Sequence, residues 1–258
     1  MIVFSAIMPH PPLIIPEIGS EGDRKKVQKT ISAMEKLRED LEKSDPETLI
    51  IISPHAEMES ERFVINSADP LRGSFIDFGY DKIYDFKNDF EAIDRITYFG
   101  NMSGMPTHLH ESFLDHGALV PLHYLTKNMR PKIIHLAFSM LSLETHYEYG
   151  KTLAKMCCDD RRIAIAASGD LSHRLIPEAP AGYSKKGKEF DELLINLLKK
   201  ADTKGIIDLD EDFVEEAGQC GLRSVMILLG ALEGKYNFNL LSYEGPFGVG
   251  YLTASLKP

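Results

Sequence analysis

Short apolar runs alternate along this chain with longer amphipathic segments, and this alternation limits the folds open to it. The runs TLIIIS at residues 48–53 and RIAIAAS at residues 162–168 are almost entirely apolar. Strands of this kind are typical of a sheet that is covered by helices on both faces. The pattern therefore predicts an α/β fold, a three-layer α/β/α sandwich around a mostly parallel or mixed central sheet.

The expected elements follow from the same pattern. We expect strands at Ile2–Met8, Thr48–Ser53, Arg62–Ser67, Lys132–Phe138, Arg161–Ala167, Phe238–Tyr243 and Val249–Ser255. We expect helices at Glu21–Lys43, Asp89–Tyr98, Leu119–Leu125, Ser142–Cys158, Lys185–Lys200, Asp210–Ala217 and Leu222–Leu232. The last two strands are expected to form an antiparallel hairpin, and residues 67–88 an excursion from the sheet. No linker, repeat or change of composition divides the chain, so we expect one domain over residues 1–258.

Charge and cysteine content exclude several classes of protein. The formal net charge of −10 argues against a general nucleic-acid binder, because a phosphate backbone would be repelled. No apolar run approaches the roughly 20 residues that a membrane span needs, and the N-terminus lacks the basic residues of a signal peptide. Three cysteines, two of them adjacent (Cys157 and Cys158), suit a reducing cytoplasm better than a disulfide framework. Whether the chain is a whole protein or part of a fusion stays open.

Polar residues follow several of the predicted strands at the point where each strand ends. His10 lies in PHPP after the first strand, His55 in PHA after the second, and His173 in SGDLSH after the run RIAIAAS. Glu244 follows the strand at residues 238–243. Because ligands of open α/β sheets bind beyond the carboxyl ends of parallel strands, we expect these side chains to meet at one rim.

Two imidazoles and one carboxylate are the ligand set of a mononuclear non-haem iron centre with open coordination positions, and they would equally suit catalytic zinc. His116, in LDHGA, is a candidate acid or base beside such a centre. The adjacent Asp115 could orient its ring through a hydrogen bond. Cys220 could line the pocket, but we favour a turn before a helix.

The other histidines give weaker signals. His135 lies inside the strand IIHLAFS, and we interpret it as structural. His108 and His110 have the spacing of metal ligands, but we place them in a loop, where two alternate histidines indicate little. The Cys157-Cys158 pair at a helix end is more typical of packing than of redox chemistry.

Six motifs together resemble one family over residues 1 to about 255: MPHPPLIIPEIG, ISPHA, LDHGALVPL, ASGDLSHRL, GQCGLRS and LSYEGPFGVGY. The family is the LigB-like superfamily of class III extradiol dioxygenases. The most similar group is the LigB-like domain of the AmmeMemoRadiSam group, and the Memo-like proteins are more distant. The resemblance implies the same α/β/α fold.

The resemblance also implies roles for individual residues. It implies that His10 and His55 are the imidazole ligands of the metal and Glu244 the carboxylate ligand. Memo-like relatives carry a cysteine in place of that carboxylate, and Glu244 therefore places this chain closer to the iron-binding pattern.

Three further residues match the pocket of these relatives. His173 matches the histidine that acts as acid and base, and His116 matches a histidine that contacts substrate. Asp170 matches a polar residue of the pocket. With Asp115 beside His116, these residues are the expected substrate side of the site.

The implied function is that of a metal-dependent oxidoreductase that cleaves a catechol-like aromatic diol with dioxygen at Fe(II), with Zn(II) as the other candidate metal. Two alternatives stay open. One is a Memo-like protein that binds a metal or a partner without ring cleavage, and the other is a metal-dependent hydrolase. An AMMECR-type domain and a radical-SAM protein are partners implied by the resemblance alone.

Overall fold

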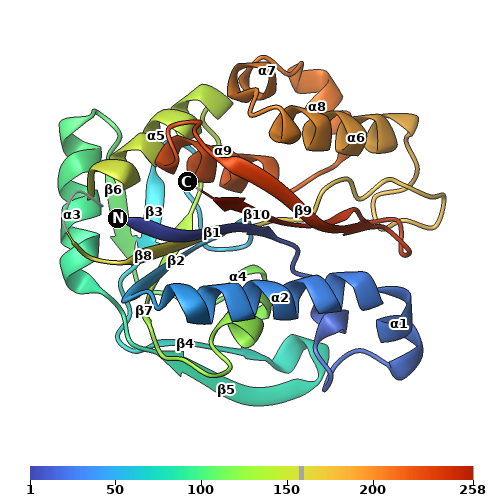
Figure 1. Ribbon diagram of the computed structural model, residues 1–258, viewed down its shortest axis with the longest axis horizontal. Helices are drawn as coiled ribbons and strands as arrows, with labels where there is room; N and C mark the ends of the chain where they lie inside the picture. Colours follow the sequence, from blue (N-terminus) through green and yellow to red (C-terminus); the bar gives the residue numbers. More distant parts are fainter. Residues whose placement is uncertain (157–159, 258) are drawn as a thin grey trace.

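A mixed sheet forms the centre of the molecule in the computed structural model, which describes residues 1–156 and 160–257 (Figure 1). Within these residues eight strands form the sheet in the order β6-β3-β7-β2-β8-β1-β10-β9. Their bounds are β1 Ile2–Met8, β2 Thr48–Ser53, β3 Phe63–Asn66, β6 Thr107–His110, β7 Lys132–Ala137, β8 Ile163–Ser168, β9 Asn237–Glu244 and β10 Tyr251–Lys257. All seven expected strands are present, so the predicted fold class is confirmed.

The four central strands run parallel. β8 pairs in parallel with β1 and with β2, and β2 pairs in parallel with β7. The last two strands form the expected antiparallel hairpin, whose β10 pairs with β1. The carboxyl ends of β1, β2, β7 and β8 consequently share one edge of the sheet, where the chain leaves toward His10, His55 and His173.

Helices cover both faces of the sheet. Their bounds are α1 Glu21–Lys26, α2 Gln28–Ser44, α3 Phe90–Met102, α4 His116–Leu125, α5 Leu143–Met156, α6 Lys185–Lys199, α7 Thr203–Ile207, α8 Glu211–Ala217 and α9 Leu222–Ala231. Helices α2 and α4 lie on one face, below the sheet in Figure 1, and α5 and α9 lie on the other with α6 to α8 beside them. Each face has its own buried apolar cluster, as a three-layer sandwich requires.

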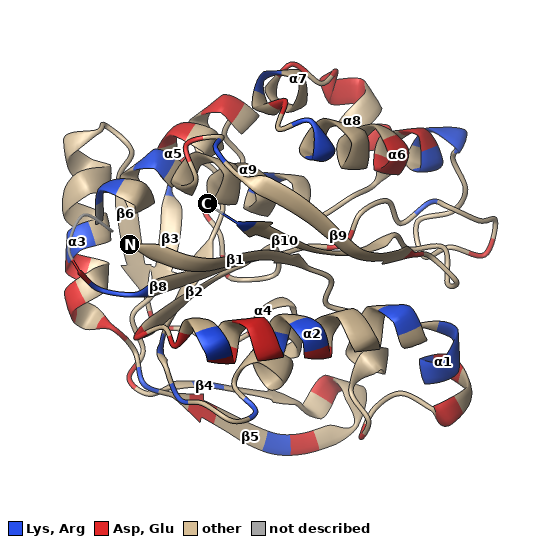
Figure 2. Cartoon of the chain, in the orientation of Figure 1, with Lys and Arg blue, Asp and Glu red and all other residues tan. Residues whose placement is uncertain are grey.

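Most charged side chains lie outside this core. Figure 2 shows the lysines, arginines and acidic residues on the outer helices and loops, whereas the central strands β1, β2 and β8 carry none. Strands β2 and β8 are buried along their whole length. In the part of the chain that the structure describes, no helix combines the length and the apolarity that a bilayer crossing demands.

The structure corrects three expectations. The single helix expected at 21–43 is two helices, because the backbone leaves the helical region at Val27 (φ −116°, ψ 30°). Residues 107–110, expected as a loop, form the edge strand β6. The short helix α7 lies in a segment where none was expected. Residues 67–88 leave the central sheet, as expected, and form a separate two-stranded sheet, β4 Leu71–Phe75 and β5 Tyr80–Phe86, joined by a 3-10 turn at Ile76–Phe78. Cys157 and Cys158 lie outside the described residues.

Helices α5 and α9 cross with their backbones in contact, and glycines make this possible. A Cβ on Gly150 would lie 2.1 Å from the carbonyl oxygen of Ile227, and one on Gly230 would lie 1.9 Å from that of Tyr147. Real Cβ atoms do not approach a carbonyl oxygen so closely. This crossing fixes α9, whose N-terminus follows Cys220.

Gly230→Ala should therefore destabilise the protein by about 1–3 kcal/mol, because an added methyl group must push the two helices apart. Without that clash, alanine would stabilise a helix interior by about 1 kcal/mol. Gly22→Ala in α1 is the control, since the nearest heavy atom to its Cβ is 3.8 Å away. Chemical unfolding of both variants measures the difference, and equal stability of Gly230→Ala and the parent chain would contradict the proposed crossing.

Candidate metal centre

His10 lies just beyond the end of β1, and its ring is held in one orientation. Its Nδ1 is 2.9 Å from Ser168 Oγ, and the Ser168 hydroxyl lies 2.6 Å from the carbonyl oxygen of Gly117, to which it donates. Because the single hydroxyl proton of Ser168 goes to Gly117, the serine oxygen accepts the hydrogen bond from His10. Nδ1 therefore carries the proton, and the lone pair of Nε2 is free to bind a ligand.

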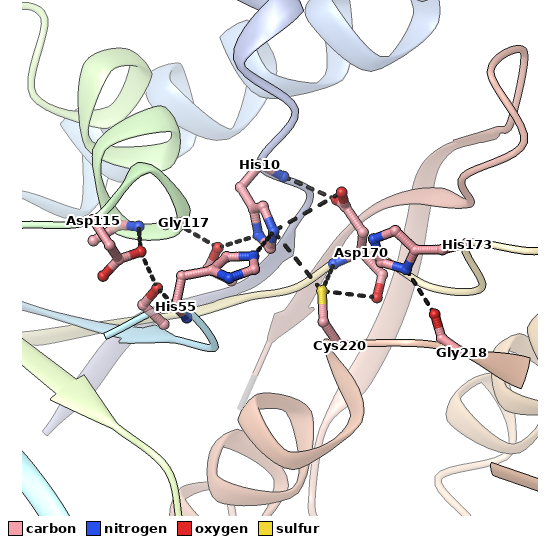
Figure 3. Close-up of polar contacts among 11 residues, drawn as sticks. His10, His55, Asp115, Gly117, Asp170, His173, Gly218 and Cys220 are labelled. Carbon is pink, nitrogen blue, oxygen red and sulfur yellow. Dashed lines mark hydrogen bonds and ion pairs between the residues drawn. The ribbon is translucent and has the colours of Figure 1, made fainter. Parts of the chain in front are cut away.

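His55 lies just beyond the end of β2, with its ring against that of His10. The two Nε2 atoms are 3.1 Å apart, and the ring planes are 85° from parallel (Figure 3). His10 is buried, whereas His55 is exposed, so the pair opens toward solvent on one side. Gly117 allows this arrangement, because a Cβ there would lie 2.6 Å from Ser53 Oγ and 3.1 Å from His55 Cδ2.

The His10–His55 pair suits a metal ion. Two nitrogens that are each about 2.1 Å from one ion, at roughly a right angle, lie about 3 Å apart. Imidazole binds a metal through a lone pair in its ring plane, and the planes of these two rings intersect. Within the described residues, His10, His55 and His116 also form a group whose ligand atoms all lie within 4.8 Å of one another.

The three histidines remain neutral at lower pH than usual. Burial is the largest cause for each, and it lowers the pKa of His10 well below its ordinary value. The neighbouring imidazoles add to this effect at His10 and His55. Since only a neutral imidazole can bind a metal, this environment favours the ligand form near neutral pH.

His116 is the first residue of α4, and its ring lies on the outer side of His55. The two rings are stacked, with centroids 4.3 Å apart and planes only 28° from parallel. Nearly parallel planes separated in this way direct their lone pairs past one another. In this orientation, His116 is poorly placed to bind an ion that His55 also binds. A donor on the same side as His10 is better placed to bind it.

Cys220 provides such a donor. Its Sγ lies 3.8 Å from His10 Nε2, and the backbone N–H of Asp170 points at the same sulfur from 3.3 Å (Figure 3). Two glycines bring this loop so close, since a Cβ on Gly169 would lie 2.1 Å from Gly221 Cα. Burial raises the pKa of the Cys220 thiol, so without a metal the residue is a neutral thiol. Sequence analysis favoured a turn before a helix, and Cys220 indeed lies just before α9.

Glu244 does not join this group. Its Oε1 accepts hydrogen bonds of 2.7 Å from both the backbone N–H and the hydroxyl of Thr30, in the first turn of α2. Val27, which precedes α2, supplies no capping side chain within the described structure. Glu244 instead accepts a hydrogen bond from one of the free backbone N–H groups at this helix end. In addition, β9 is two strands away from β1. The carboxylate of Glu244 thus serves as a helix cap, and it is not part of the group of possible ligand atoms found within the described residues.

Asp170 lies on the other side of His10. Its Oδ1 accepts the backbone N–H of His10 at 3.0 Å, and its Oδ2 is 3.9 Å from His10 Nε2. The residue is buried, and burial raises the pKa of its carboxyl group to about 7. The structure thus brings Asp170 to the site, as expected.

His173 is held by the loop before α9. Its backbone N–H and its Nδ1 both lie within hydrogen-bond distance of the carbonyl oxygen of Gly218, at 3.1 and 2.7 Å. A carbonyl only accepts, so Nδ1 carries the proton and Nε2 has the free lone pair. Burial lowers the pKa of His173, which keeps that lone pair available as a base.

Asp115 takes a different place from the expected one. Its carboxylate accepts the hydroxyl of Ser53 at 2.6 Å and the N–H of Ala118 at 3.1 Å, and it pairs with His135 Nε2 at 2.9 Å. It therefore caps α4, and it reaches His55 through Ser53, whose Oγ accepts the His55 N–H at 3.3 Å. The buried His135 thus helps to hold Asp115 in place. Its position in the middle of a strand did not predict this contact with Asp115.

His108 and His110 lie elsewhere. They project from β6 and pair with two exposed carboxylates, Glu59 and Glu57. These pairs lie on the segment that follows His55, and they fasten it to the edge of the sheet.

The chain matches a known family over almost its whole length. The family is described as the catalytic LigB subunit of aromatic ring-opening dioxygenase, and the match covers residues 5–254. Protein CA_C1420 of Clostridium acetobutylicum is 37% identical over 265 residues, which cover 97% of this chain and 56% of that protein. The chain thus spans about half the length of this relative.

Two further similarities are more distant. The 3,4-dihydroxyphenylacetate 2,3-dioxygenase of Escherichia coli is 24% identical over 204 residues, which cover 72% of this chain and 74% of the enzyme. The crystal structure of protein JW3007 of Escherichia coli K12 superposes with a TM-score of 0.70 at 16% identity and covers 98% of this chain and 99% of that one. The latter similarity supports the fold alone.

Cys220→Ser should lower the affinity for a divalent metal by at least about tenfold, because even the loss of a residue that only supports a ligand costs 10–100-fold. Glu244→Gln is the matched control. It should leave metal affinity within about twofold, and it should cost up to about 1 kcal/mol of stability because α2 loses a charged cap. Metal titration by calorimetry and chemical unfolding measure the two effects. The reverse result, a loss of affinity in Glu244→Gln alone, would restore Glu244 as the ligand.

Asp170→Asn should change how stability depends on pH in the metal-free protein. The raised pKa keeps native Asp170 protonated between about pH 4 and 7, where the unfolded chain has already lost this proton. The native state thus binds more protons in that range, and the contribution of Asp170 to the free energy of unfolding falls as the pH rises. The largest slope is about 1.4 kcal/mol per pH unit. Urea unfolding of both proteins from pH 4.5 to 7.5 isolates this contribution, and parallel profiles would exclude it.

Proposed function

Because the chain belongs to the LigB family, we propose that it is a metal-dependent oxidoreductase of the extradiol type that opens the ring of a catechol-like aromatic diol. The observation that carries this proposal is the His10–His55 pair, whose Nε2 atoms lie 3.1 Å apart with His173 on the neighbouring loop. A similarity to a dihydroxyphenylacetate dioxygenase supports the choice of substrate class.

The residues assigned to the metal are His10, His55 and Cys220. The two imidazoles offer neutral nitrogens, and the thiol becomes a thiolate when it binds a cation. Fe(II) is the proposed metal, and it would supply the redox chemistry that lets dioxygen react with the diol. The exposed side of His55 leaves room for substrate beside the ion site.

His116 and His173 are assigned to the substrate. His116 presents its ring beside His55 at the open side of the site, where it can contact a bound diol. His173 carries its free lone pair on Nε2, and its lowered pKa makes it a base at neutral pH that can take a proton from a substrate hydroxyl. Gly218 holds the ring through Nδ1, so Nε2 keeps its direction during proton transfer.

Asp170 and Asp115 support these groups. Asp170 holds the backbone of His10, and with a pKa of about 7 it can also exchange a proton near neutral pH. Asp115 orients His55 through Ser53 and fixes the start of the helix that carries His116. In this assignment neither carboxylate binds the metal.

The thiol of Cys220 favours a second candidate function. A set of two histidines and one cysteine differs from the two-histidine, one-carboxylate set of non-haem iron oxygenases, and it also suits Zn(II) with an open position. A zinc hydrolase, or a Memo-like protein that binds metal without ring cleavage, would use the same three residues.

The finer relationships are also proposals. We assign the chain to the AmmeMemoRadiSam group on the motifs of its sequence, and to the cytoplasm on its cysteine content. An AMMECR-type domain and a radical-SAM protein are its proposed partners on the same ground.

The Fe(II)-loaded protein should consume oxygen in the presence of a catechol and form a yellow ring-opened product. Oxygen-electrode and absorbance assays over small and bulky catechols measure this. The Zn(II)-loaded protein is the control and should consume none. If a protein with verified Fe(II) content takes up no oxygen with any catechol, the second candidate function replaces the first.

His173→Ala should keep the metal stoichiometry and lower turnover by about 10²–10⁴-fold, the usual effect of losing a positioned proton carrier. His123→Ala is a matched control, because that histidine pairs with Tyr84 away from the metal group. Metal analysis and steady-state kinetics on the same preparations measure both properties. A loss of metal from His173→Ala would show that this residue is a ligand instead.

A further inference from the structure

An exposed phenylalanine lies directly against the candidate site. Phe78 is at the end of the 3-10 turn that joins β4 to β5, and its ring centroid is 5.4 Å from that of His116 at an angle of 63°. His116 in turn stacks on His55. Three rings thus follow one another from the proposed metal position outward, and Phe78 is the outermost.

The β4–β5 hairpin that carries Phe78 is rigidly attached at its base. The N–H of Leu114 donates to the carbonyl oxygen of Arg72 at 2.7 Å, just before α4 begins. A Cβ on Gly73 would lie 2.7 Å from the carbonyl oxygen of Leu114, so only glycine permits this contact. Leu71 and Phe75 are completely buried in the core beneath α4. These contacts join the hairpin to the start of the helix that carries His116.

Phe78 itself does little to hold the hairpin together. Its side chain is 40% exposed, whereas Phe75 is buried and packs edge-to-face on Tyr84, with ring centroids 5.6 Å apart. An exposed aromatic ring at the mouth of a polar site gains free energy when a ligand covers it. The uncovered part of Phe78 therefore points to an apolar ligand surface.

We infer that Phe78 forms an aromatic wall of the substrate site and binds the ring of a planar aromatic diol whose oxygens face the metal. This inference rests on the proposed function and adds the residue that recognises the ring. Edge-to-face or offset contact with Phe78 would favour a flat aromatic ligand over an aliphatic ligand with the same chelating oxygens. Phe78 is a binding residue in this account and takes no part in metal binding.

The test uses Zn(II)-loaded protein, which does not consume the probe, and two chelators. 4-Nitrocatechol is the aromatic probe, followed by its absorbance, and acetohydroxamate is the non-aromatic probe, followed by calorimetry. Phe78→Ala should weaken the binding of 4-nitrocatechol by about tenfold, since the variant loses both the aromatic contact and the apolar area that the ring would cover. Its affinities for acetohydroxamate and for Zn(II) should stay within about twofold of the parent values.

Two variants serve as controls. Phe78→Tyr keeps the ring and should bind 4-nitrocatechol nearly as well as the parent chain. Ile76→Ala removes an exposed apolar side chain from the same turn and should have no effect. Equal affinity of Phe78→Ala and the parent chain for 4-nitrocatechol would overturn the inference and leave the proposed function standing. Failure of the parent Zn(II) protein to bind 4-nitrocatechol would overturn both.

Discussion

The candidate site depends on one hydroxyl group at the end of β8. Ser168 accepts from His10 and donates to Gly117, and so it joins the ends of β1 and β8 to the helix that begins with His116. This contact fixes the tautomer of His10 and directs Nε2 toward His55. It is possible because β1 and β8 run parallel and in register, with Met8 opposite Ser168, so that their carboxyl ends reach the same height. The orientation of His10 toward His55 is thus a consequence of the sheet.

Much of this could be predicted from sequence, and the failures have physical causes. Strands buried on both faces have an unmistakable pattern, and polar residues after parallel strands must share an edge, so His10, His55 and His173 were placed correctly. Glu244 lies at the end of a strand too, but strand order is a long-range property, and β9 is two strands away from β1. Cys220 comes to the site only because Gly169 and Gly221 touch, a contact between residues that lie far apart along the chain. The sequence could therefore indicate Cys220 only as a residue that could line the pocket, without showing which loop it contacts.

The β4–β5 hairpin contributes to the candidate site although it lies outside the central sheet. Its segment has no clear apolar periodicity, because glycine occupies one of the three buried positions of β4 and four of the seven residues of β5 are exposed. The sandwich would be complete without the hairpin, yet the turn places Phe78 beside His116. The ends of the sheet strands thus supply the two proposed histidine ligands, the loop before α9 supplies Cys220, and an excursion from the sheet supplies the proposed wall. Because different parts of the chain supply the metal ligands and the wall, the ligand set and the substrate choice can vary independently on one fold.

The central claim is that His10, His55 and Cys220 bind one metal ion. X-ray absorption spectroscopy of the metal-loaded protein tests it most directly, because sulfur and nitrogen ligands differ in distance. The account predicts one sulfur at about 2.3 Å together with nitrogen or oxygen ligands at about 2.0–2.2 Å, and loss of the sulfur signal in Cys220→Ser. A coordination shell made of nitrogen and oxygen alone in the unmodified protein would contradict it.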